Sequence, residues 1–132
     1  MAINFDKALG IHPQALQVLG RRTEILSANL ANADTPGFKA RDINFADALK
    51  QAATSGPDDI KRTHAGHMST GVGAGGEPTL MYRTPNQPSL DGNTVDLEQE
   101  RAAFAENSVR YQASVTFLER RFRGLLTAIR GD

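Results

Sequence analysis

The residues best suited to metal chemistry lie in one glycine-rich stretch. His64 and His67 form the only close histidine pair, and Asp58 and Asp59 precede them. A metal site needs three or four ligands, each oriented by neighbouring groups. Because the stretch is rich in glycine, we interpret both histidines as solvent-exposed side chains. A small metalloenzyme built on His64 and His67 is the weaker alternative, and it predicts stoichiometric metal uptake that His67→Ala abolishes.

No other pattern is typical of catalysis or cofactor binding. The glycines of residues 71–76 resemble a phosphate-binding loop, but the Lys-Ser/Thr ending and a preceding apolar strand are missing. Glu98 and Glu100 stand two residues apart and do not face each other on a helix, so we expect them in a solvent-exposed turn. The sequence therefore predicts no enzyme, no metal and no cofactor.

Composition excludes further classes of protein. The 132 residues hold 15 Lys+Arg and 15 Asp+Glu, and this zero net charge argues against a nucleic-acid binder or a polybasic membrane anchor. Without cysteine there is no disulfide and no thiolate metal site. No apolar run could span a bilayer, and we expect no secretory signal at the N-terminus. The length favours one domain.

The spacing of apolar residues predicts a helix over residues 13–32. Pro13 suits the first helical position, and Asn32 to Gly37 ends the helix, with Pro36-Gly37 fitting the centre of a type II turn. A heptad seam, with Thr23 as its polar member, runs along one face. Its apolar members are Leu16, Leu19, Leu26 and Leu30, and a second stripe consists of Ile11, Val18 and Ile25.

The middle of the chain holds most of the glycines and prolines and reads as looser structure. Residues 44–53 predict a short helix with Asn44 as N-cap and with Phe45 and Leu49 on one face. Residues 54–79 predict a loop with a short strand near 60–63, and residues 80–83 predict its partner strand.

The strongest prediction is a helix over residues 97–130, capped by Asp96 with Gln99 as the capping-box partner. Arginines at positions 120, 121, 123 and 130 complement the helix dipole and could pair with other subunits. At 1.5 Å per residue this helix would be about 51 Å long, and the first about 30 Å. Its seam consists of Phe104, Tyr111, Val115, Leu118, Phe122, Leu125 and Ile129.

The predicted fold is mainly α, with the N- and C-terminal helices forming a coiled-coil-like pair. Because more than 60 residues connect the two helices, either relative orientation is possible, and we favour the antiparallel one. Residues 1–35 and 94–132 would form the core of a single structural unit, and residues 36–93 a loosely ordered middle with a short β-hairpin. Pairing leaves about 20 Å of the longer helix uncovered. We expect the second stripe to stay uncovered too, because the middle is poor in apolar residues. The seams and this stripe therefore predict an assembly interface with copies or relatives.

Three stretches resemble bacterial flagellar rod, hook and hook–filament junction proteins. They are residues 27–45 (SANLANADTPGFKARDINF), 82–97 (YRTPNQPSLDGNTVDL) and 100–111 (ERAAFAENSVRY). The second and third are similar to proximal rod members of this family. The resemblance implies a structural, non-enzymatic subunit that stacks helically in the periplasm, with its terminal helices in the inner wall.

The resemblance also implies partners and an export route. The partners would be other copies, other rod proteins, the base-ring adaptor and the export gate, but no nucleic acid or small-molecule substrate. The subunit would link the base ring and export gate to the distal rod, transmit torque, and be exported through the flagellar type III apparatus without a cleaved signal. A soluble helical adaptor or export chaperone is the alternative, and it predicts a stable cytoplasmic dimer.

The same resemblance implies roles for single residues. Asn29 and Asn32 would make polar contacts from the helix to the turn or to other subunits, with simple C-capping as the alternative for Asn32. Pro36, Gly37 and Phe38 would set the chain reversal. Phe5 and Leu9 resemble a short hydrophobic export signal, although an ordinary amphipathic turn explains their spacing equally well. Gly10 and Pro13 would interrupt a helix that continues to the N-terminus.

Overall fold

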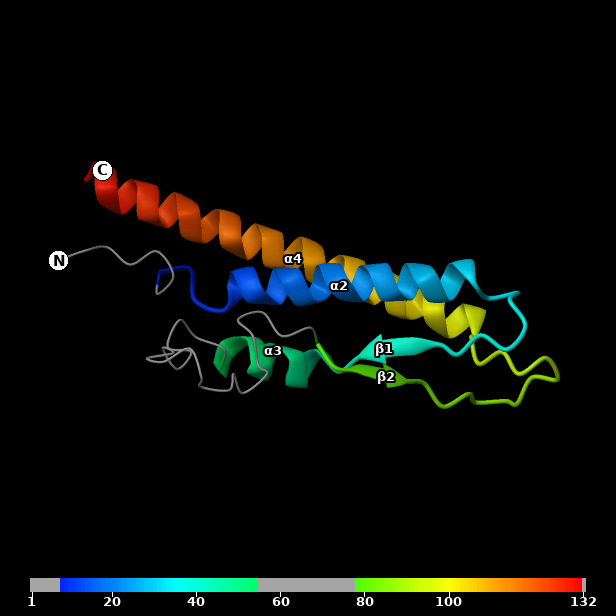
Figure 1. Ribbon diagram of the computed structural model, residues 1–132. Coiled ribbons are helices and arrows are strands. Elements are labelled where there is room, and N and C mark those ends of the chain that lie inside the picture. The colour runs from blue at the N-terminus through cyan, green and yellow to red at the C-terminus, as the bar shows by residue number, and fades with distance from the viewer. Residues whose placement is uncertain (1–7, 55–77, 132) are drawn as a thin grey trace, which may run out of the picture.

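The computed structural model describes residues 8–54 and 78–131. It is mainly helical, with the terminal helices packed together and a small two-stranded antiparallel sheet, so the predicted fold class is confirmed. Figure 1 shows α4 packing along α2 and crossing it, so that the C-terminal part of α4 lies on the far side of α2 from the sheet and α3, while its first turns lie on the side of the sheet. Among the described residues, none of the helices combines the length and the apolar character that a membrane crossing demands. The elements are α2 (His12–Ala31), β1 (Arg41–Ile43), α3 (Phe45–Thr54), β2 (Leu80–Tyr82) and α4 (Leu97–Arg130).

Local signals explain where α2 begins and ends. Gly10 adopts a φ of +60°, which interrupts the helical conformation before α2, and proline occupies the first turn of α2. Asn32 caps the other end, and its side-chain amide donates to the carbonyl of Ala28 at 2.8 Å. The amide of Phe38 then donates to the carbonyl of Thr35 at 3.2 Å, with Gly37 at a φ of +73°. The predicted helix and the predicted type II turn are both confirmed.

Helix α4 has the predicted bounds and the predicted cap. The carboxylate of Asp96 accepts from the backbone amides of Glu98 and Gln99 at 3.2 and 3.3 Å. Gly131 ends the helix in the left-handed conformation, at a φ of +75°. The helix runs antiparallel to α2, since Asn107 contacts Leu19 while Arg121 contacts Ala8, much nearer the N-terminus.

The sheet pairs β1 with β2, in the register Arg41 to Tyr82 and Ile43 to Leu80. The predicted strand near residue 80 is thus confirmed, but its partner is β1, which the sequence did not predict to be a strand. The strand predicted near residues 60–63 lies outside the described residues. Helix α3 matches the predicted short helix, and the side chain of Asn44 accepts from the amide of Ala46 at 3.1 Å.

The expectation that the second stripe of α2 stays uncovered is wrong for two of its residues. Val18 is buried in a cluster with Ile43 and Ala48, and Ile25 and Phe45 pack against that cluster. Strand β1 and helix α3 therefore cover the stripe, because a few apolar residues placed across one face are enough. The third member, Ile11, is 40% exposed.

The other face of α2 meets α4 through a seam that is more polar than predicted. Leu19 and Leu26 are buried, as expected for seam residues, while Leu16 and Leu30 are half-buried. The fully buried positions on α4, however, are Glu100 and Asn107 rather than members of its predicted apolar seam. The interpretation of Glu100 as a solvent-exposed residue is therefore wrong.

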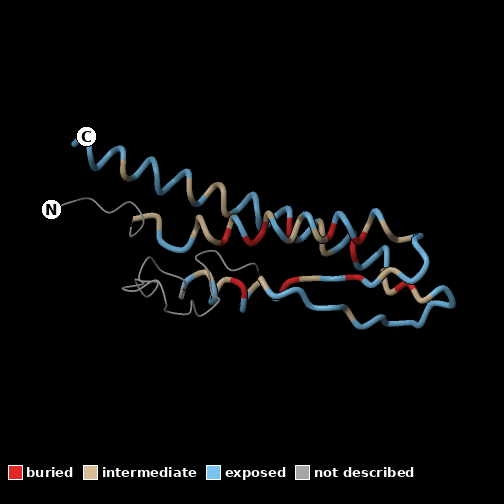
Figure 2. The backbone as a smooth tube through the Cα atoms, viewed as in Figure 1, coloured by how far each residue is buried: buried red, intermediate tan, exposed pale blue. Residues whose placement is uncertain are grey.

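The apolar residues of α4 are covered unevenly along the helix. Phe104, Val115, Leu118 and Leu125 are half-buried. Figure 2 shows that buried segments gather where α2, β1 and α4 meet, whereas the C-terminal part of α4 is mostly exposed. The exposed members of the predicted seam are Tyr111 at 41%, Phe122 at 47% and Ile129 at 60%.

Candidate functional site

Four charged side chains join the layers of the protein, and we call them the polar clasp: Arg22, Asp42, Arg83 and Glu100. Arg22 donates from Nε and Nη2 to the two carboxylate oxygens of Asp42, both at 2.9 Å. Arg83 donates to Asp42 Oδ2 at 2.5 Å and pairs with Glu100 Oε1 at 3.1 Å. The clasp therefore ties α2, β1, the residue after β2, and α4 into one network.

Asn29 connects the clasp to the sheet. Its Nδ2 donates to the carbonyl of Arg41 at 2.7 Å and to Glu100 Oε2 at 3.1 Å, and its Oδ1 accepts from the amide of Arg41 at 3.1 Å. The side-chain amide thus replaces a neighbouring strand at the outer edge of β1. Asn29 is only 1% exposed, so this contact lies within the subunit rather than between subunits.

The clasp balances its charges in a mostly buried site. Burial favours the neutral form of Asp42, but hydrogen bonds from Arg22, Arg83 and the amide of Ile43 outweigh it, so the pKa of Asp42 lies below its ordinary value. The hydrogen bond to Asp42 likewise raises the pKa of Arg22. Removing one partner would leave an uncompensated charge in this site, which is strongly destabilising.

A second polar contact closes the turn after α2, and it centres on Asn93. Its Nδ2 donates to the carbonyls of Asn32, Ala33 and Thr35 at 3.0, 2.7 and 2.9 Å, and its Oδ1 accepts from the amide of Val95 at 2.7 Å. Asn93 is buried, and the sequence did not single it out.

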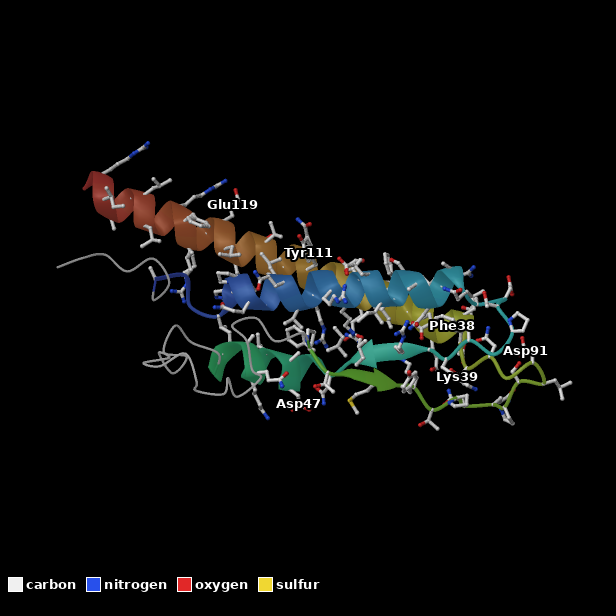
Figure 3. All side chains as sticks on the ribbon, in the orientation of Figure 1. Phe38, Lys39, Asp47, Asp91, Tyr111 and Glu119 are labelled. Atoms are coloured by element: carbon white, nitrogen blue, oxygen red, sulfur yellow. The ribbon has the colours of Figure 1, made fainter. Side chains whose placement is uncertain are left out.

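The same region contains the predicted turn residues. Gly37 donates its amide to the carbonyl of Asp91 at 2.9 Å, and Phe38 accepts from the amide of Thr94 at 3.0 Å. Figure 3 shows Phe38, Lys39 and Asp91 together at this end of the protein, where Lys39 Nζ donates to the carbonyl of Gly92 at 2.7 Å. Two of the stretches that carry the flagellar resemblance, residues 27–45 and 82–97, thus bind each other in space.

Asn107 is the polar residue of α4 that meets Thr23. Its Nδ2 donates to Thr23 Oγ1 at 2.8 Å and to the carbonyl of Leu19 at 3.1 Å. Its Oδ1 is buried without a hydrogen-bond partner. The sequence contained a signal for this contact. Thr23 is the polar residue of a leucine seam, and a buried hydroxyl group needs a hydrogen-bond partner, which the facing helix can supply.

Helix α2 begins at His12, whose ring lies 6.1 Å from the ring of Phe117 on α4. Helix α4 continues past this point, and we call residues 118–131 the α4 tail. Figure 3 shows Glu119 on this part of the helix, away from the sheet and α3. Phe122 and Ile129 are exposed here, as is Leu126 at 51%, which the sequence reasoning left out. Of the two residues proposed for export, Leu9 is half-buried and Phe5 lies outside the described residues.

The charges of the clasp are used up in pairing with one another. Within residues 8–54 and 78–131, no group of three or more His, Cys, Asp or Glu side chains could hold a metal ion. His64 and His67 lie outside these ranges.

Comparison with known proteins identifies the family. Residues 9–39 match the family described as flagella basal body rod protein. The chain is 50% identical to the flagellar basal body rod protein FlgB of Aeromonas hydrophila, covering 100% of this chain and 99% of that protein. It is 41% identical to the protein of that name in Salmonella typhimurium, covering 99% of each chain, and 41% identical to that of Escherichia coli, covering 98% and 97%. The chain therefore belongs to the flagellar basal-body rod protein family FlgB.

Proposed function

We propose that this rod protein is a subunit of the proximal rod, which assembles helically in the periplasm and links the base ring and export gate to the distal rod. Membership of the family makes it a structural component of the basal body that assembles with other rod proteins. The observation that carries the finer proposal is the α4 tail. Among the described residues, Phe122 and Ile129 of the seam and the neighbouring Leu126 are exposed there.

The polar contacts and the tail have different roles in this proposal. The clasp, Asn29 and Asn93 hold the subunit in one shape, while the uncovered seam receives neighbours. Close-packed apolar interfaces resist deformation, so many such contacts in a rod would transmit torque. Export through the flagellar type III apparatus, with Phe5 and Leu9 as signal, remains part of the proposal.

The proposed assembly interface consists of the seam residues that residues 8–54 and 78–131 do not enclose. Four residues of the interface predicted from the sequence are no longer included, because α4, β1 and α3 already cover them: Val18, Leu19, Ile25 and Leu26. The terminal helices would form the assembling core, with the middle segment bracing it. The interface residues are Leu16, Leu30, Phe104, Tyr111, Val115, Leu118, Phe122, Leu125 and Ile129.

Deletion of the gene tests this function. The deletion strain should be non-motile, and electron microscopy of its basal bodies should show base rings without rods. Restoration by the wild-type gene should return both. Rods built beyond the base ring in the deletion strain would contradict the proposal. A stable cytoplasmic dimer found by fractionation would favour a soluble adaptor or export chaperone instead.

A further inference from the structure

The two edges of the small sheet end differently. At the outer edge of β1, Asn29 binds both backbone groups of Arg41 and so takes the place of a further strand. Strand β2 forms the other edge, on the far side of β1 from α2 (Figure 1). Among the described residues, neither a further strand nor a side chain is hydrogen-bonded to this edge of β2. An edge in this state can pair with the strand of another chain.

The register of the sheet shows which backbone groups of β2 are open. The amide and carbonyl of Arg41 point to Asn29, away from β2, and Tyr82 lies directly opposite Arg41. In an antiparallel pair, opposite residues alternate between bonding to each other and pointing their groups outward. Tyr82 and Leu80 therefore point their amides and carbonyls out of the sheet, while those of Met81 face β1.

The side chains along this edge are apolar and exposed. Leu80, Met81 and Tyr82 are 42%, 54% and 73% exposed. Residues 78–82 include no charged side chain, although charged side chains are a common means by which edge strands avoid pairing with other chains. Two copies of this strand would therefore meet without repulsion between like charges.

A pocket of about 430 Å³ lies beside the same strand. Met81 lines it from β2, and Ala48 and Lys50 line it from α3. Residues that lie directly opposite each other in a sheet present their side chains on the same face. A strand that pairs with β2 would therefore place the side chain opposite Met81 next to this pocket.

A second copy of β2 fits the edge in one antiparallel register. When Met81 lies opposite the second copy's Met81, Leu80 of each copy lies opposite Tyr82 of the other. All the outward amides and carbonyls of Leu80 and Tyr82 then find partners. The contacts of tyrosine with leucine across the strands stabilise the pair further. The spacing within β2 thus makes the strand complementary to itself.

We propose that the free subunit pairs with a second copy of itself through the open edge of β2, which joins the two sheets into one. A two-fold contact closes on itself, so it joins subunits in pairs and does not extend a rod. The inference therefore goes beyond the proposed function and concerns the subunit before assembly. Pairing covers a strand edge that attracts other chains when it is left open.

The small size of the contact determines how stable the pair is. Stable interfaces bury about 1,200–2,000 Å² in total, and three strand residues from each copy bury much less. The pair therefore forms at high protein concentration and separates on dilution. This behaviour distinguishes it from the stable dimer that a soluble adaptor or export chaperone would form.

Single cysteines test the register in the full chain, which has no cysteine of its own. Met81→Cys places two thiols directly opposite each other, where the Cα atoms lie about 4.5 Å apart, within reach of a disulfide. Under mild oxidation at high protein concentration, this variant should form a disulfide-linked dimer at least about tenfold faster than Leu80→Cys. A mixture of Leu80→Cys and Tyr82→Cys should form the mixed dimer faster than either variant links to itself.

A proline substitution tests the outward backbone groups. Tyr82→Pro removes an amide that points out of the sheet, so the pairing of β2 with β1 is kept. Added to Met81→Cys, it should slow cross-linking at least about tenfold, whereas the control Tyr82→Val, which keeps the amide, should slow it far less. Circular dichroism checks that each variant keeps its helix content. If Tyr82→Pro lowers the helix content, the mixed-dimer experiment decides alone.

Amide hydrogen exchange of the wild-type chain supplies an independent readout. The amides of Leu80 and Tyr82 should be protected at high protein concentration and exchange freely at low concentration. Protection at both concentrations would show that the same chain covers the edge, and protection at neither would show that the edge stays unpaired. Either result overturns the inference, as would equal cross-linking rates for Met81→Cys and Leu80→Cys.

The proposed function has a separate test. Rods that form in the deletion strain contradict the rod role and say nothing about pairing through β2. An absence of register-specific cross-linking, together with non-motile deletion cells that lack rods, overturns the pairing inference alone.

Discussion

Asn29 on α2 pairs with Arg41 on β1 as a neighbouring strand would, accepting from its amide at 3.1 Å and donating to its carbonyl at 2.7 Å. The same amide donates to Glu100 on α4, 71 positions away in the chain. One buried side chain therefore holds a helix, a strand and the second long helix together.

Replacing Asn29 should destabilise the subunit strongly. Asn29→Ala removes three hydrogen bonds and leaves buried groups of Arg41 and Glu100 without partners, which should lower the free energy of unfolding by about 2–3 kcal/mol. Urea unfolding followed by circular dichroism measures this. Asn32→Ala removes the side-chain cap at the C-terminal end of α2, where Asn32 is less buried than Asn29, and should cost about 1 kcal/mol or less. Equal losses for the two variants would contradict the role given to Asn29.

Stability should fall in acid because of Asp42. Its pKa in the folded protein is below the ordinary value of 3.8, so the unfolded chain binds this proton first as the pH drops. The contribution of Asp42 is thus complete above pH 3.8 and is lost as the pH falls from there through the lower folded pKa. Urea unfolding between pH 6 and 2 should show this decline.

The matched variants separate Asp42 from the other carboxylates. Asp42→Asn should lower stability at neutral pH, because Arg22 and Arg83 lose their anion, and should flatten the acid decline. Asp34→Asn, at an exposed position after α2, should keep the wild-type profile. An acid decline as steep in Asp42→Asn as in wild type would rule out the clasp as its cause.

Asn107 should specify the register of the two helices more than their stability. Asn107→Leu removes a buried amide whose Oδ1 has no partner, so the free energy of unfolding should change by less than about 1 kcal/mol. The two helices should then lose their single alignment. Because the chain has no cysteine, spin labels at Gln17→Cys and Gln112→Cys can report the distance between them. A distribution as narrow as in wild type would contradict this role.

Two glycines should respond in opposite directions to alanine. Gly37 adopts a φ of +73°, so Gly37→Ala should cost about 1 kcal/mol. Gly124 lies inside α4, where an added methyl group meets nothing within 4 Å, so Gly124→Ala should stabilise by about 0.8–1 kcal/mol. Thermal unfolding compares them, and stabilisation by Gly37→Ala would argue against the type II turn.

The helices could be predicted because their signals are local. Pro13, Asp96 and the Pro36-Gly37 turn each act within a few residues of where they stand. The uncovered end of α4 also followed from two helix lengths alone. A resemblance carried by short motifs pointed to the rod family. The 50% sequence identity to the FlgB protein of Aeromonas hydrophila, which extends over the whole chain, confirmed it.

The clasp could not be predicted, because its four side chains come from four separate segments. Nothing local distinguishes Glu100 from the exposed Glu98 two residues earlier. Strand β1 was missed for a similar reason, since three residues are too few to show a period and its edge is completed by a side chain. Tertiary contacts decide both features.

The central claim is that the uncovered seam of the α4 tail is an assembly surface, and complementation of the deletion strain tests it most directly. Ile129→Asp places a charge in the exposed seam, so the purified variant should fold normally while the strain fails to swim and builds no rod. Gln112→Asp, also exposed on α4 but before the tail, should restore swimming. Full motility with Ile129→Asp, at normal protein levels, would contradict the account.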